Sequence, residues 1–291
     1  MDKPPLKKPT LPLKKTTKED VVKFLTKTGF ILEMEVAEIL EKLGYKIQVN
    51  RYFHDYDEDK KREIDIIATK EIGGISVFLI IECKQSLIDD WIFICSDKRP
   101  SRYYNYVKHS PRVSDLEKIK AFDHLYLLDH SVPLAQNYII RDKTKKKSTS
   151  AQVEICLEKL PKALISLADF ENSDKARTIY LPIAVFSGQI FLAHYDGSLK
   201  INEFDLVQYS SEVASEKYTY HWRNLFPMGM GDEEKSIPNS PIAETSLHLG
   251  YRYLIDFVTK EGLVRLVSII EAGIKKIDLE KWSLPAQIEE K

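Results

Sequence analysis

The chain has 291 residues, a formal net charge of −1 and 43% hydrophobic residues. A chain of this length forms one large domain or two small ones, and it has enough apolar residues to bury a sizeable core. The near-zero net charge excludes a global field that would attract nucleic acid, although local basic patches are compatible with it.

The three cysteines, Cys83, Cys95 and Cys156, form no Cys-x-x-Cys motif, so neither a disulfide framework nor a zinc site is predicted. No apolar run approaches the roughly 18 residues of a membrane span. The lysine- and proline-rich start has no apolar segment typical of a signal peptide. We therefore expect a cytoplasmic protein that does not enter a membrane.

Composition divides the chain into three parts. Residues 1–15 are predicted to form a disordered basic and proline-rich arm, which either touches a phosphate backbone or only keeps the chain in solution. Residues 16–275 are expected to form a single domain with an insertion at about 97–150. Residues 276–291 form a polar tail.

Two helices are predicted at the start of this domain. Thr17 to Asp20 resembles a capping box with Asp in place of Glu, which begins a short helix. Gly44 is a suitable residue just after the end of a second helix. Glu33, in the first turn of that helix, is favoured there by the helix dipole alone, or it has a role near a metal. The apolar face of the second helix consists of Leu32, Val36, Ile39, Leu40 and Leu43.

The most informative stretch is 62–86. Its two apolar runs flank Gly73-Gly74, and they predict a β-hairpin that follows a first strand at 45–53. Asp65 interrupts the first run, and Glu82-Cys83-Lys84 ends the second. Carboxylates at such positions are expensive to desolvate unless they are paired or bind a cation.

Side chains alternate across a strand, so Glu82 and Lys84 are expected on one face and Cys83 on the other. The hairpin connection brings Asp65 close to Glu82 or its neighbours. Two nearby carboxylates repel each other unless a cation lies between them, and hard oxygen ligands favour Mg²⁺. A lysine beside a metal-bound water can orient that water. This combination indicates metal-assisted phosphodiester hydrolysis.

The Glu-x-Lys spacing has little specificity in a chain that is 30% charged. It also occurs in polar stretches at Glu58–Lys60, Glu233–Lys235 and Glu289–Lys291. Only the pair at Glu82 closes an apolar strand that follows a strand with an embedded Asp. The alternative interpretation is a strand end with a surface ion pair.

This stretch resembles the PD-(D/E)XK, or restriction-endonuclease-like, nuclease superfamily, and most closely its Mrr-like branch. The resemblance covers residues 30–86: Asp65 matches the first acidic position, and Glu82 and Lys84 match Glu-x-Lys. The family's helix glutamate falls on Glu33, with Glu35 as the second choice. Gln85 matches a variation of that branch. Ile64 precedes Asp65, so the proline of the family name is absent.

The resemblance implies an α/β (α+β) fold with a mixed sheet, namely a restriction-endonuclease-like αβββαβ core with an antiparallel extension and flanking helices. It also implies a Mg²⁺-dependent endonuclease that cuts DNA and leaves 5′-phosphates. Asp65, Glu82 and the backbone carbonyl of Cys83 would bind Mg²⁺, for which Mn²⁺ would substitute. Lys84 would position the attacking water, and Glu33 would be a third acidic group. Restriction, phage defence and repair all use such a site, and a homodimer is expected by analogy.

Several basic and aromatic residues are candidates for contact with DNA, because arginine and lysine neutralise phosphates and tyrosine stacks on bases. Each has a plain alternative as a surface charge, a packed tyrosine or a solvated loop. The candidates are Arg62, Gln85, Lys98, Arg99, Arg102, Tyr103, Lys145 and Lys146.

The rest of the chain is predicted to alternate between strands and helices. Strands are expected at 91–95, 178–186, 189–195, 199–209 and 251–258. Helices are expected at 114–128, at 151–168 with a kink at Pro161, and at 259–274. Two other functions remain open: a catalytically inactive nucleic-acid-binding or protein-interaction module on the same fold, and an enzyme acting on RNA or a nucleotide messenger.

Overall fold

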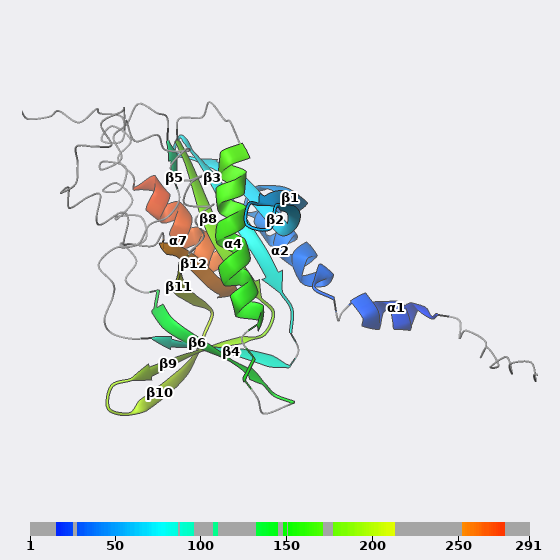
Figure 1. Cartoon of the computed structure of the whole chain (residues 1–291), viewed down its shortest axis with the longest axis vertical. Coiled ribbons are helices and arrows are strands. Elements are labelled where there is room, and N and C mark those ends of the chain that lie inside the picture. The colour runs from blue at the N-terminus through cyan, green and yellow to red at the C-terminus, as the bar shows by residue number, and fades with distance from the viewer. Residues whose placement is uncertain are drawn as a thin grey trace, which may run out of the picture.

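The computed structural model describes residues 16–25, 28–86, 88–95, 107–109, 132–144, 148–149, 151–170, 177–212 and 252–276 (Figure 1). The helices are α1 (Lys18–Leu25), α2 (Phe30–Lys42), α4 (Ala151–Phe170) and α7 (Leu263–Lys275). The strands are β1 (Lys46–Asp55), β2 (Lys60–Ile72), β3 (Ile75–Lys84), β4 (Asp89–Cys95), β5 (Val107–His109), β6 (Leu134–Asp142), β7 (Ser148–Thr149), β8 (Arg177–Phe186), β9 (Gln189–Tyr195), β10 (Leu199–Phe204), β11 (Leu206–Glu212) and β12 (Arg252–Thr259).

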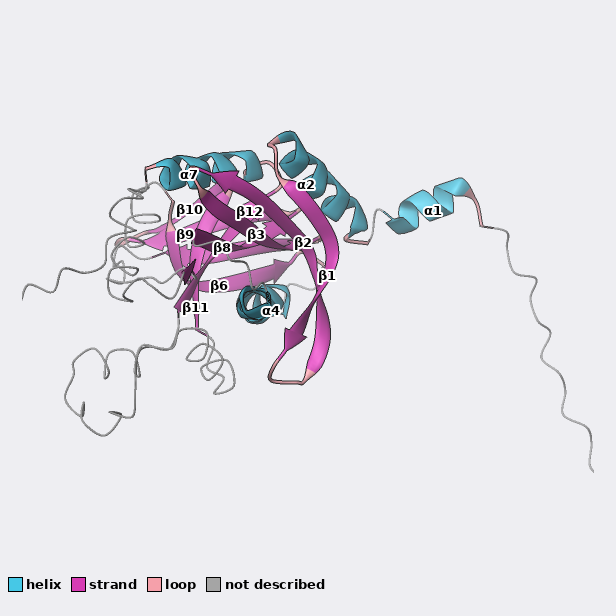
Figure 2. Cartoon of the chain, turned by 90° about the horizontal axis from the view of Figure 1, so that it is seen from above, coloured by secondary structure: helices cyan, strands magenta, loops and turns pink. Residues whose placement is uncertain are grey.

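The described strands form one mixed sheet in the order β1-β2-β3-β8-β12-β11-β6-β4-β9-β10, with β5 beside β8 and β7 beside β6. Strands β1, β2 and β3 are antiparallel, whereas β3, β8 and β12 are mutually parallel neighbours. Helices α2 and α7 cover one face of the sheet and α4 covers the other (Figure 2). The predicted mixed α/β class is therefore confirmed.

Two hydrophobic cores, one on each face, hold the helices to the sheet. Leu32, Val36 and Leu40 of α2 and Leu266 and Ile270 of α7 pack in the first core. The α4 core contains Val153, Cys156, Leu160, Ala163 and Leu164 against Ile80, Tyr180 and Phe186 of the central strands. Because β3 and β8 are covered on both faces, they are apolar along most of their length, as a central parallel pair requires.

Local sequence signals have the predicted structures at the start of α1 and at the end of α2. The Thr17 hydroxyl accepts the N–H of Asp20, and Asp20 Oδ2 accepts the N–H of Thr17, which forms the capping box. Gly44 follows α2 with φ of +85°, a conformation that costs little only for glycine. Gly73 and Gly74 also have positive φ, which matches the two-residue turn predicted between β2 and β3.

Two details differ from the prediction. The single strand expected at 199–209 is divided at Asp205 into β10, which pairs with β9, and β11, which pairs with β12. The expected insertion at 97–150 contains β6, which lies inside the sheet between β11 and β4. Its pairing depends on residues far away in the chain, so local composition did not reveal it. The helix predicted at 114–128 lies outside the described residues.

None of the helices within the described ranges combines the length and the apolar composition needed to cross a bilayer.

Candidate active site

The hairpin places Asp65 beside Glu82, as predicted. The paired residues of β2 and β3 run from Ile72 opposite Ile75 to Ile66 opposite Ile81. One further step of the same register brings Asp65 opposite Glu82. At this step the Asp65 side chain enters the backbone pairing, because its Oδ2 accepts the N–H of Cys83 at 2.7 Å. The carboxylate is therefore anchored to the strand that carries the other site residues.

The chain bends where Asp65 enters the sheet. Ile64 packs in the α4 core and Ile66 in the opposite core, although residues two apart in a regular strand share a face. The register of β1 and β2 places Asn50 opposite Asp65, and Asn50 has a φ of +52°. Both strands thus change faces at one point. This local bend makes room for a polar side chain between two apolar layers.

Glu82 is the central acidic group of the site. Its side chain is only 1% exposed, and its Oε1 accepts a hydrogen bond from Lys84 Nζ at 2.5 Å. The two residues therefore share a face of β3, as the alternation predicted. A buried carboxylate without a partner would be very costly, and the ion pair with Lys84 provides Glu82 with such a partner.

A second lysine, which sequence reasoning missed, completes the cluster. Lys159 of α4 places Nζ 2.5 Å from Glu82 Oε2 and 3.7 Å from Asp65 Oδ1, and its side chain is 16% exposed. The sequence carries a weak signal for it: Lys159 lies one turn from Cys156, within the apolar stripe of α4 that faces the sheet. A lysine at such a position predicts a carboxylate partner on the sheet, because lysine is rarely buried without one.

The site disfavours the charged form of Asp65. Burial and the charge of Glu82 raise the pKa of Asp65 to about 6, against the opposing effects of Lys159, the Cys83 N–H and Lys84. Burial alone would lower the pKa of Lys84, but its contacts with Glu82 outweigh this and raise it. Such perturbed groups gathered at one place are typical of functional sites.

Of the two helix glutamates, Glu33 is the one whose charge is coupled to the site. Burial, followed by the charges of Glu82 and Glu63, raises the pKa of Glu33. Glu35 instead forms an ion pair with Lys260, 2.9 Å away, at the end of β12. The structure therefore favours Glu33 over Glu35 as the third acidic group.

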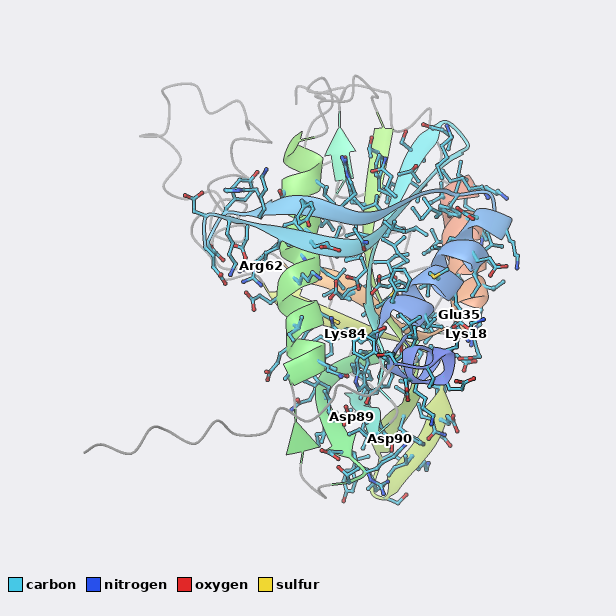
Figure 3. The ribbon with its side chains drawn as sticks, turned by 90° about the vertical axis from the view of Figure 1, so that its right-hand side faces the viewer. Lys18, Glu35, Arg62, Lys84, Asp89 and Asp90 are labelled. Carbon is cyan, nitrogen blue, oxygen red and sulfur yellow. The ribbon has the colours of Figure 1, made fainter. Side chains whose placement is uncertain are left out.

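The structure describes only two of the eight residues predicted to contact DNA, Arg62 and Gln85. Gln85 directly follows Lys84 at the end of β3. Arg62 lies apart from Lys84 in Figure 3, and its guanidinium is paired with Asp55 and Glu58 around the β1–β2 turn. The others, Lys98, Arg99, Arg102, Tyr103, Lys145 and Lys146, lie outside the described residues.

The donor set of the site suits a hard divalent cation. Asp65 and Glu82 offer carboxylate oxygens, which Mg²⁺ prefers. In a strand, the N–H and C=O of one residue point toward the same neighbour. Because the Cys83 N–H points to Asp65, the Cys83 carbonyl is directed to that side as well. A positive charge, the Lys159 ammonium, already lies between the two carboxylates.

A second acidic group within the described residues could also hold an ion by geometry. Carboxylate oxygens of Asp55, Glu58 and Glu158 lie within 4.8 Å of one another. However, Arg62 and Lys162 both form ion pairs with Asp55, and each also pairs with one of the two glutamates. Their positive charges already compensate these carboxylates.

No family model matches the chain, and neither the curated proteins nor the solved structures contain a significant match to it.

Proposed function

We propose that this protein is a metal-dependent phosphodiesterase that cleaves DNA. The observation that supports this most is the convergence of Asp65, Glu82 and Lys84 where β2 and β3 separate. The ammonium group of Lys159 lies between the two carboxylates, so this position accommodates a positive charge. A buried and a partly buried carboxylate with a lysine at hydrogen-bonding distance are the groups that metal-assisted phosphodiester hydrolysis requires.

Each residue has a distinct role in this proposal. Asp65, Glu82 and the carbonyl of Cys83 would hold Mg²⁺, or Mn²⁺ in its place. The ion, when bound, would supply an acidified water and charge compensation for the scissile phosphate. The Lys84 ammonium would orient that water and offset the negative charge that develops on the phosphate. The hydrogen bond from Cys83 fixes the direction of Asp65.

The architecture gives further support to a restriction-endonuclease-like assignment. The expected core consists of a helix, three strands, a second helix and a last strand. The helices correspond to α2 and α4, the three strands to β1, β2 and β3, and the last strand to β8. Strands β4 to β7 are inserted between β3 and α4. The site residues lie on β2 and β3, and Glu33 lies at the start of α2, as that resemblance implies. The chemistry of the site, rather than the fold, remains the main argument.

The test is a nicking assay on supercoiled plasmid, single-stranded DNA and RNA, with Mg²⁺, with Mn²⁺ and with chelator. We expect metal-dependent cleavage of DNA that falls at least about a hundredfold in Asp65→Ala and in Lys84→Ala. Lys200→Ala is the matched control, because it removes a lysine from an exposed ion pair with Asp196 on the β9–β10 hairpin.

Three other outcomes of the assay would change this proposal. Cleavage that persists in both site variants would show that another site or another enzyme acts. A lack of cleavage on every substrate, together with a lack of Mn²⁺ binding by folded wild-type protein, would refute the proposal. Cleavage of RNA alone would change the substrate class but keep the site.

One observation favours a second candidate, a non-enzymatic binding module. Lys84 and Lys159 balance the charges of Asp65 and Glu82, so the four groups form a neutral set without a metal. A purely structural ion-pair cluster is then sufficient to explain their burial. Calorimetric titration of the folded protein with Mn²⁺ separates the two candidates, because a structural cluster has no need to bind the ion.

A further inference from the structure

The Lys159 ammonium occupies the space that a metal ion would need. Its Nζ lies 2.5 Å from Glu82 Oε2 and 3.7 Å from Asp65 Oδ1. A Mg²⁺ ion bound to these carboxylates would lie about 2.0–2.1 Å from each ligand oxygen. An ammonium nitrogen and a metal ion cannot both lie between the two carboxylates at such distances.

Electrostatic repulsion also prevents the Lys159 ammonium and a metal ion from lying together between Asp65 and Glu82. Two positive charges only a few ångströms apart repel strongly at the effective dielectric of a protein surface, and the double charge of a divalent ion doubles the repulsion. Glu82 is almost fully buried and already has Lys84 on its other oxygen. A bound ion would therefore force one of the two lysines to move away from Glu82.

Lys159 is the lysine that can leave. Lys84 is attached to β3 immediately after the metal-binding segment, whereas Lys159 reaches the carboxylates from the separate helix α4. The two lysine side chains are similarly exposed, so the separate attachment of Lys159 is what distinguishes it. The four-carbon stem of a lysine can redirect its charge to water while the stem stays packed.

We propose that Lys159 is a resident competitor for the metal: it neutralises Asp65 and Glu82 in the metal-free protein, and a divalent ion binds only by displacing it. This inference rests on the proposed metal-dependent function. Lys159 then has two measurable effects. It stabilises the metal-free fold, and it weakens the affinity of the site for divalent cations.

The test measures metal binding without DNA and without activity. Free Mn²⁺ is followed by its electron paramagnetic resonance signal during titration of wild type, Lys159→Met and Lys159→Gln. Methionine retains most of the apolar stem, and glutamine can still donate a hydrogen bond to Glu82, so one of the two is expected to fold. We expect at least about tenfold tighter Mn²⁺ binding when the charge of Lys159 is removed.

Lys70→Met is the matched control. Lys70 is also a half-buried lysine, on β2, and it forms an ion pair with Glu271 of α7 at 2.7 Å, five residues away from Asp65 along the strand. The change removes the same charge from the protein but leaves the site intact. We expect its Mn²⁺ affinity to remain within about twofold of wild type, because five residues of strand, at about 3.3 Å each, separate Lys70 from the site by more than the Debye length of about 8–10 Å.

Thermal unfolding gives an independent readout. Without metal, the Lys159 variants should melt below wild type, because two buried carboxylates then share one lysine. Saturating Mn²⁺ should raise the melting temperature of the variants more than that of wild type.

The outcomes separate this inference from the proposed function. Equal Mn²⁺ affinity in wild type and Lys159 variants would overturn the competitor role but leave the metal site in place. Mn²⁺ binding by the variants alone would be the strongest support. A lack of binding in every folded variant would overturn both the competitor role and the metal-dependent function.

Discussion

Helix α4 carries two lysines three residues apart, and each enters a different cluster of carboxylates. Lys159 contacts Asp65 and Glu82, which together with Lys84 make up the proposed catalytic cluster. Lys162 belongs to a second group, the turn cluster, at the β1–β2 connection. The turn cluster consists of Asp55, Glu58, Arg62, Glu158 and Lys162.

The two clusters contain similar groups, but their central carboxylates differ in the hydrogen bonds they accept and in the charges beside them. Asp55 is fully buried, and it accepts the N–H groups of Asp57 and Glu58 on one oxygen and contacts Arg62 and Lys162 with the other. Asp65 accepts a single backbone N–H. It also faces Glu82, whose charge contributes to a pKa of about 6. The cations of the turn cluster compensate its central carboxylate, whereas burial and the charge of Glu82 keep the pKa of Asp65 raised in the other cluster, as is typical of functional sites.

The largest stability effect is expected in the turn cluster. Asp55→Ala removes the acceptor of two backbone N–H groups and the carboxylate between Arg62 and Lys162. We expect a loss of about 3 kcal/mol in the free energy of unfolding, measured by urea denaturation. A loss below about 0.5 kcal/mol would show that this cluster is not structural.

In the proposed catalytic cluster, by contrast, we expect the loss of a carboxylate to increase the free energy of unfolding. Asp65→Asn removes a destabilised charge, and its amide oxygen can still accept the Cys83 N–H. Because the pKa of Asp65 is raised from 3.8 to about 6, its ionisation disfavours the folded state at neutral pH. We expect Asp65→Asn to gain about 2 kcal/mol of stability at pH 7 without metal while losing cleavage.

The pH dependence of this gain gives a separate check. Between pH 4 and 6 the folded protein binds the Asp65 proton more tightly than the unfolded chain does, so the stability that Asp65 contributes falls as the pH rises. The gain of Asp65→Asn should therefore be absent near pH 3 and fully developed above pH 7. A gain that does not change with pH would mean that the charge of Asp65 is not its cause.

The smallest expected effect distinguishes the two helix glutamates. Glu33 is coupled to Glu82, whereas Glu35 pairs with Lys260. We expect Glu33→Gln to lower cleavage by about tenfold, the scale of one lost charge interaction, and Glu35→Gln to change it by less than about twofold. The reverse result would move the third acidic role to Glu35.

The sequence by itself determined the hairpin and its polar interruptions. Alternation along β3 placed Glu82 and Lys84 on one face, and the Gly73-Gly74 turn set the register that brings Asp65 to Glu82. These are short-range consequences of strand geometry. The capping box of α1 and Gly44 after α2 are equally local, which is why they were predictable.

Only the tertiary structure decided what surrounds these residues. Lys159 lies 77 residues after Glu82 in the chain, and it meets the site because α4 packs across β3 and β8. The choice of Glu33 over Glu35 and the pairing of Arg62 with Asp55 depend likewise on how separate elements dock. The position of β6 inside the sheet follows from pairing with β4 and β11. A periodic pattern shows which face of an element is buried but not which distant segment packs against it, so local sequence rules cannot identify the partner.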